Sequence, residues 1–162
     1  LHLRLKMNLA TLLKAIDGTD GYFVDVGERV FRGQIRFGQE TVLPYITIMD
    51  TPVQPEELPI PADAKAQYAE ADYLIQGFCQ VGSPHPSDPA DLLAADILRV
   101  LGQERRNRGT FQCLGLKAVT ALSIGVPVVR EVDTHPTDVI CCWVRVGVRY
   151  VIPDLTKPLN YS

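Results

Sequence analysis

The residues best able to do chemistry in this sequence are a cysteine and two histidines. Cys79 is followed six positions later by His85, and His135 is a second histidine that could reach it in a fold. A thiolate beside an imidazole is the arrangement of a cysteine nucleophile with its general base. Cys79, however, falls on the apolar face of a predicted strand, where burial keeps a thiol protonated and inert. We therefore expect no catalytic dyad.

The cysteines and histidines also lack the spacing of a metal site. The chain has four cysteines and three histidines, but no C-x-x-C pair, and the histidines are scattered. Cys141 and Cys142 are adjacent in a strand-like run, so their side chains should point to opposite faces. We predict buried free thiols, which fit synthesis in a reducing cytosol. No metal or cofactor is expected.

Two further groups of charged residues could bind or transfer a proton. Asp88 and Asp91 resemble a carboxylate pair, but capping explains both, because they flank Pro89 at a predicted helix start. Three arginines (Arg105, Arg106 and Arg108) form the most basic patch of the chain. This patch could hold a phosphate or a partner's carboxylates, or it could be a solvated helix end.

The composition describes one globular domain. The 162 residues are 46% hydrophobic and 22% charged, and their net charge is -3. These values exclude a mainly disordered chain, and a dedicated nucleic-acid binder would carry a basic excess. No apolar run is long enough for a transmembrane helix. Phosphate loops, G-x-G-x-x-G, the nucleophile elbow and H-E-x-x-H are also missing, so we do not expect an enzyme.

Two helices and two early strands are predicted. Apolar residues at helical spacing from Leu5 to Ile16 indicate an amphipathic helix that Asp17 and Gly18 end. A second helix runs from Asp88 to Gly102, with a polar extension possible beyond. Alternation over residues 30–37 and 43–50 favours two strands joined as a β-hairpin.

A proline-rich loop over residues 51–71 should separate these strands from the next. It is either an interaction arm or a passive flexible loop, because so long an irregular stretch in a small domain is usually functional or disordered. Its prolines and acidic residues are the candidate contacts of that arm: Pro52, Pro55, Glu56, Glu57, Pro59 and Pro61.

The remainder of the chain is predicted to form strands over residues 72–82, 119–124, 126–132 and 139–152. The last run has one wholly apolar face, and its other face carries Arg145 and Arg149. An antiparallel sheet with one buried face produces this pattern. We therefore predict an α+β fold: a mostly antiparallel, twisted sheet with helices packed on one face. Residues 1–152 would form one domain and residues 153–162 a loose tail.

Several short motifs resemble a known family. Val30-Phe31-Arg32-Gly33, a turn and Leu43 to Pro52 are similar to the opening hairpin of the tail terminator (tail completion, neck) proteins of tailed bacteriophages. Residues 73–77, 86–90 with the helix that follows, 122–125 and 128–130 are similar to their next strand, helix start and late hairpin. The likeness spans roughly residues 1–150.

This resemblance implies a structural virion protein without catalysis or cofactor. It implies a homo-oligomeric ring, usually a hexamer, that ends the tail tube and joins it to the neck or connector. Genomic DNA would pass through the lumen without sequence-specific binding, which a mildly acidic chain permits. The arginines Arg105, Arg106, Arg108, Arg145 and Arg149 are then candidate contacts with neighbouring subunits or with neck and tail proteins.

Two other functions stay open. One is a different component of the same region of the virion, such as a head-closure, collar or tube subunit. The other is a small cytosolic enzyme whose site is assembled in space, which would require a deep pocket with convergent polar groups.

Overall fold

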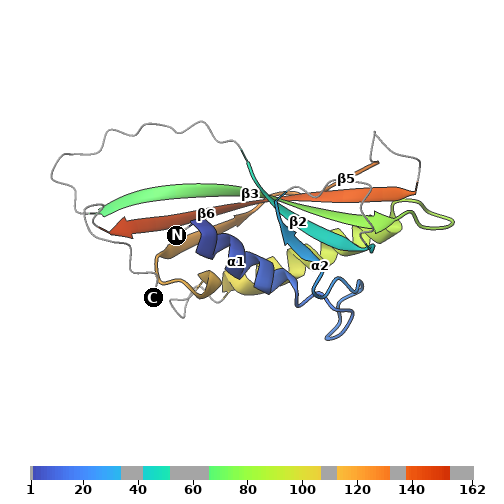
Figure 1. Ribbon diagram of the computed structural model, residues 1–162, viewed down its shortest axis with the longest axis horizontal. Helices are drawn as coiled ribbons and strands as arrows, with labels where there is room; N and C mark the ends of the chain where they lie inside the picture. The colour runs from blue at the N-terminus through green and yellow to red at the C-terminus, as the bar shows by residue number, and fades with distance from the viewer. Residues whose placement is uncertain (1, 34–41, 52–65, 107–112, 132–137, 154–162) are drawn as a thin grey trace.

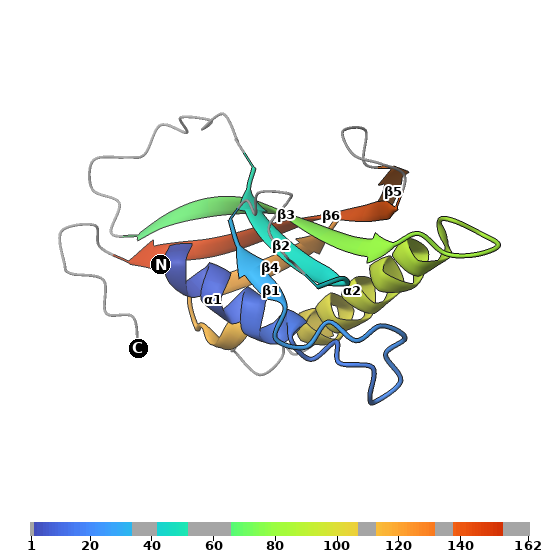
Figure 2. The ribbon, with the colours of Figure 1, turned by 45° about the vertical axis from the view of Figure 1, so that its right-hand side comes forward.

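The computed structural model places two helices against one face of a six-stranded sheet (Figure 1). The structure describes residues 2–33, 42–51, 66–106, 113–131 and 138–153. Both helices lie on the same side of the two longest strands in the two ribbon views (Figures 1 and 2). The predicted α+β class is therefore confirmed.

Both predicted helices form, with bounds that differ in part from the prediction. In α1 (His2–Leu13) the buried side chains include Leu5, Leu9 and Leu13, one stripe of an amphipathic helix. This helix ends at Leu13, before the predicted end, although Ile16 is still fully buried in the turn that follows. The second helix, α2 (Asp88–Arg106), continues beyond Gly102 as far as Arg106.

The six strands form one mixed sheet in the order β1-β2-β3-β6-β4, with β5 also pairing with β6. Four of the five pairings are antiparallel. The β4 strand has the predicted bounds, and β6 extends one residue past residue 152. The strands are β1 (Val30–Arg32), β2 (Tyr45–Asp50), β3 (Ala66–Gln80), β4 (Val119–Ile124), β5 (Val128–Glu131) and β6 (Val139–Pro153).

The predicted hairpins are wrong. β1 and β2 pair in parallel, with Val30 beside Ile46 and Arg32 beside Ile48. β4 and β5 both pair with β6, so they form no late hairpin. Alternation assigns a residue to a face of the sheet, but it carries no information on strand direction or neighbour.

The bounds of the proline-rich loop also need correction. Ala66 to Ala71 belong to β3, which pairs with β6 along its whole length. The run Ala69-Glu70-Ala71-Asp72 has little β propensity of its own, so its partner strand decides its structure. The prolines and glutamates of the predicted arm lie outside the described residues, as do Arg108 and residues 154–162.

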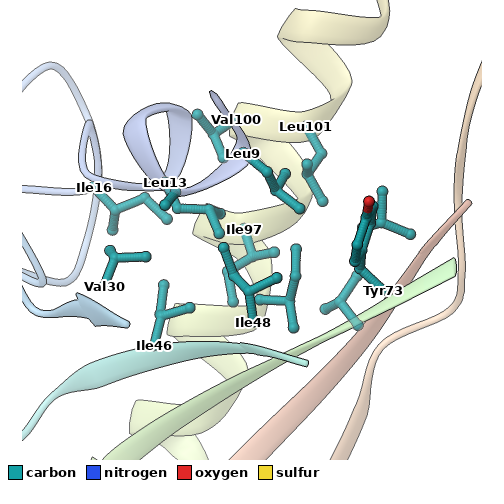
Figure 3. Packing of buried hydrophobic residues seen from close by; sticks show 14 of the residues in the cluster. Leu9, Leu13, Ile16, Val30, Ile46, Ile48, Tyr73, Ile97, Val100 and Leu101 are labelled. Atoms are coloured by element: carbon teal, nitrogen blue, oxygen red, sulfur yellow. The ribbon is translucent and has the colours of Figure 1, made fainter. Parts of the chain in front are cut away.

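The main core lies between the sheet and the helices. Figure 3 shows Leu9 and Leu13 of α1 and Ile97 and Leu101 of α2 around Ile48 of β2. All five are fully buried. Both helices therefore pack on one face of the sheet. On the opposite face, packing comes from the side chains of the strands themselves.

Candidate interaction surface

The face of the sheet opposite α1 and α2 is the candidate functional surface, and we call it the open face. In β6, every second residue from Ile140 to Tyr150 is buried in the core, so the residues between them belong to the open face. The register of β3 on β6 continues the same alternation across the sheet. No helix that the structure describes lies on this side (Figure 1).

An aromatic patch occupies the part of the open face where β2, β3 and β6 meet. Tyr45 and Phe78 are paired across β2 and β3 and pack with Cys141 as a second hydrophobic cluster, which Trp143 borders. The Arg130 guanidinium of β5 lies 5.1 Å from the Trp143 ring centroid, a cation–π contact. The indole Nε1 of Trp143 is buried and has no hydrogen-bond partner among the residues that the structure describes.

A charged strip follows the same face toward the other end of β6. The Arg149 guanidinium donates from Nη2 to Glu70 Oε1 at 2.6 Å and from Nε to the same oxygen at 2.9 Å. Both side chains are more than half exposed, so the pair contributes little to stability. Arg145 is exposed and lies opposite Leu74. The strip therefore presents guanidinium groups to the surroundings.

Position 147 in this strip is a glycine because neighbouring side chains occupy the space that a Cβ would fill. A Cβ at this position would lie 2.4 Å from Ser123 Oγ and 3.1 Å from Asp72 Oδ1. The Ser123 hydroxyl donates to the Gly147 carbonyl oxygen at 3.3 Å. The glycine thus allows polar side chains of β3 and β4 to approach each other over β6.

The structure separates the predicted arginines into two groups. Arg145 and Arg149 are exposed on the open face. Arg105 and Arg106 are exposed in the last turn of α2, in the helical layer on the opposite side of the sheet. Cations in a last helical turn interact favourably with the helix dipole, so a structural role already accounts for these two.

All four cysteines are buried, as predicted. Burial raises the pKa of the Cys79 thiol from 9.0 to about 12, and that of Cys142 by the same amount. His85 is exposed, whereas the Cys79 thiol lies 3.6 Å from the Pro89 carbonyl oxygen inside the core. A thiol in this state is a poor nucleophile. Cys142 lies in the main core and Cys141 in the aromatic patch, which confirms the predicted opposite faces.

A shallow hollow of about 530 Å³ lies at the side of the molecule, between the chain that precedes β1 and the start of α2. Its lining combines Arg29, His85 and Asp88 with the apolar Phe23 and Leu92. Asp88 lies in the first turn of α2, where a carboxylate interacts favourably with the helix dipole. Within the described ranges, no three His, Cys, Asp or Glu side chains gather as metal ligands.

Sequence reasoning missed the aromatic patch. The sequence pattern places Phe78 on a strand face of mixed polarity and Tyr45 on a separate strand. Their contact depends on the register of β2 on β3, which alternation does not report. The signal that the sequence offers for this patch is an aromatic residue on the less apolar face of each of two strands.

The comparisons with known proteins give little more. No family model and no curated protein matches the chain. A solved structure of a protein without a functional name aligns with 98% of this chain and 99% of its own, at 12% identity and a TM-score of 0.45. In the part of the chain that the structure describes, no helix is long and apolar enough to cross a membrane.

Proposed function

We propose that this protein is a structural subunit of a tailed-phage virion, which assembles into a ring at the head-proximal end of the tail. The ring ends the tail tube, joins it to the neck or connector, and lets DNA pass through its lumen. The resemblance of the strand and helix motifs to tail terminator proteins is the starting point for this proposal.

The open face is the observation that carries the proposal. The exposed Tyr68, the half-buried Trp143 and three exposed arginines lie on a sheet face that no described helix covers (Figure 1). Aromatic and arginine side chains are enriched where protein interfaces carry most of their binding energy. A subunit that works in an assembly needs such a surface.

The charge of the chain agrees with a DNA conduit. A net charge of -3 gives the assembled ring a mild repulsion of phosphates, so DNA can move through without being held. The exposed Arg130 and Arg145 are then available for acidic protein surfaces.

The test is the assembly state and position of the protein. Light scattering and negative-stain microscopy of the purified chain should show a closed ring with a central hole. Antibody labelling of virions should place the protein where the tail meets the head. A protein that stays monomeric at high concentration and is absent from virions would overturn the proposal, and labelling along the whole tail would identify a tube subunit instead.

A further inference from the structure

One long strand of the sheet has an unpaired backbone edge. β3 pairs with β6 from Ala66 to Gln80, but β2 covers its other side only from Tyr73 to Phe78. No strand that the structure describes pairs with residues 66–71 on that side. An unpaired edge of this length is a template for a further strand.

The hydrogen bonds show which groups this edge presents. The Thr51 amide donates to the Asp72 carbonyl oxygen at 3.1 Å, so the backbone groups of Asp72 point to the β2 side. N–H and C=O groups alternate in direction from residue to residue along a strand. The N–H and C=O groups of Tyr68 and Glu70 therefore also point away from β6, toward the unpaired side.

A second unpaired edge lies at the same level on the other side of β6. Among the described strands, β4 is the last of the sheet order and pairs only with β6. The Gly125 amide donates to the Arg145 carbonyl oxygen at 2.8 Å, so the alternating groups of Leu122 and Ile124 point outward. Val148 of β6 pairs with Ala71 on one side and with Leu122 on the other, so both edges flank the same part of β6.

One exposed apolar side chain lies beside each of these edges, next to the exposed Glu70 on β3 and the exposed Ser123 on β4. Tyr68 is 69% exposed next to the β3 edge, and Val126, which follows β4, is 85% exposed. Natural edge strands are commonly protected by lysine or proline. Neither occurs from Tyr68 to Ala71 or from Val119 to Ile124.

We propose that the β3 edge of one copy pairs with the β4 edge of the next copy, so that the sheets of successive subunits join. β3 and β4 are both antiparallel to β6 and hence parallel to each other. A rotation about an axis along the strands preserves this direction, so the pair between copies is parallel. The two edges are different surfaces, so the contact is head-to-tail, and a head-to-tail contact forms a ring when the rotation between copies closes.

This inference rests on the proposed function and names the contact that builds the ring. β1 is a weaker candidate for the same contact, because it has only three residues and the chain leaves it at Gly33 with φ +100°. Very short strands are one of the means by which proteins blunt a sheet edge.

Cysteine cross-linking tests the contact directly. Tyr68→Cys and Thr120→Cys place thiols beside the two edges at nearly the same level, because Tyr68 lies opposite Val151 and Thr120 lies between the β4 residues that pair with Arg149 and Tyr150. The native cysteines are buried. With a short bismaleimide, the double variant should give a ladder of covalent oligomers up to the full ring. Each single variant should stay monomeric on a denaturing gel, and a mixture of the two should give only dimers. The matched control is Tyr68→Cys with Ala95→Cys on the exposed side of α2, which should give no ladder.

Other outcomes distinguish a failure of this contact from a failure of the proposed function. Dimers from Tyr68→Cys alone would show that β3 pairs with itself and would overturn the head-to-tail contact. Rings without any cross-link would overturn this contact and leave the proposed function standing. A monomeric double variant without cross-links would contradict both, provided that the unmodified protein is also monomeric.

A proline substitution tests the strand pairing independently of cross-linking. Tyr68→Pro removes an outward N–H and leaves the N–H groups that bind β6, so it should abolish rings while circular dichroism shows a folded monomer. Tyr68→Ala retains the N–H and should still form rings. Rings retained in the proline variant would overturn the strand pairing.

Discussion

Tyr45 and Phe78 lie opposite each other on β2 and β3, with ring centroids 4.9 Å apart and planes at 23°. They are 3% and 7% exposed, although no described helix covers them. Phe31 of β1 meets the Tyr45 ring edge-on at 6.1 Å. The open face thus has a hydrophobic cluster of its own, which fixes three strands where the helical layer gives no support.

Replacing Phe78 should destabilise the protein strongly. Phe78→Ala removes a buried ring from a small cluster, and we expect a loss of roughly 3 kcal/mol in the free energy of unfolding. Urea denaturation followed by far-UV circular dichroism measures this change. Phe31→Ala is the matched control, because Phe31 is 37% exposed and should cost less than 1 kcal/mol. Equal losses in the two variants would contradict the importance of the stacked pair.

Two glycines should respond in opposite directions to alanine. A Cβ at Gly77 would lie 2.5 Å from Leu93 Cδ2 and 2.9 Å from Cys142 Sγ, whereas one at Gly102 of α2 meets nothing within 4 Å. Gly77→Ala should therefore cost about 1–3 kcal/mol through overpacking. Gly102→Ala should add about 0.5–1 kcal/mol, because alanine favours the helix. Thermal melts of both variants test the difference in sign.

Gly77 also shows which features of the structure local sequence signals can predict and which they cannot. The start of α2 at Asp88, the bounds of β4 and the faces of β6 follow from capping, turn residues and alternation, which are local signals. The need for Gly77 is not local, since it arises where α2 and β6 both approach β3. No spacing along the chain reports that approach.

Strand direction and strand length could not be predicted either, because they too depend on contacts that are not local. The parallel pairing of β1 with β2 preserves the same faces as a hairpin would, so alternation cannot distinguish the two. The early part of β3 is a strand because β6 extends beside it. The candidate surface was therefore predicted only through Arg145 and Arg149, and its aromatic patch and open edges depend on pairings between distant strands.

Asp96 should be essential to the segment that precedes β1. Its side chain is buried in α2, and its Oδ2 accepts hydrogen bonds of 2.9 Å from the amides of Phe23 and Val24. Asp96→Ala would leave both donors unpaired, and we expect a loss of about 2–4 kcal/mol in the free energy of unfolding. Asp91→Ala, at an exposed site in the first turn of α2, should cost less than about 1 kcal/mol. Hydrogen exchange should show faster exchange at Phe23 and Val24 only in the first variant.

The buried thiols should make the protein sensitive to alkali. Burial raises the pKa of both Cys79 and Cys142 from 9.0 to about 12. The unfolded chain releases these protons near pH 9 and the folded chain near pH 12, so the unfolded state binds fewer protons between these values. The stabilising effect is complete below pH 9 and is lost as the pH rises toward 12, by about 1.4 kcal/mol per pH unit for each thiol.

Urea denaturation at a series of pH values between 8 and 10 measures this slope, on the order of one proton per thiol. Cys142→Ala removes one of the two groups and should reduce the slope at pH 9 by about 0.7 kcal/mol per pH unit, because half of the unfolded thiols are ionised there, whatever its effect on stability at neutral pH. Gly102→Ala is the control, because it changes stability without changing any titrating group and should leave the slope unaltered. A slope that is the same in Cys142→Ala and the unmodified protein would show that the thiol does not stay protonated in the fold. Tyr45, Tyr73 and Tyr150 also have a raised pKa through burial, so they steepen the loss only at still higher pH.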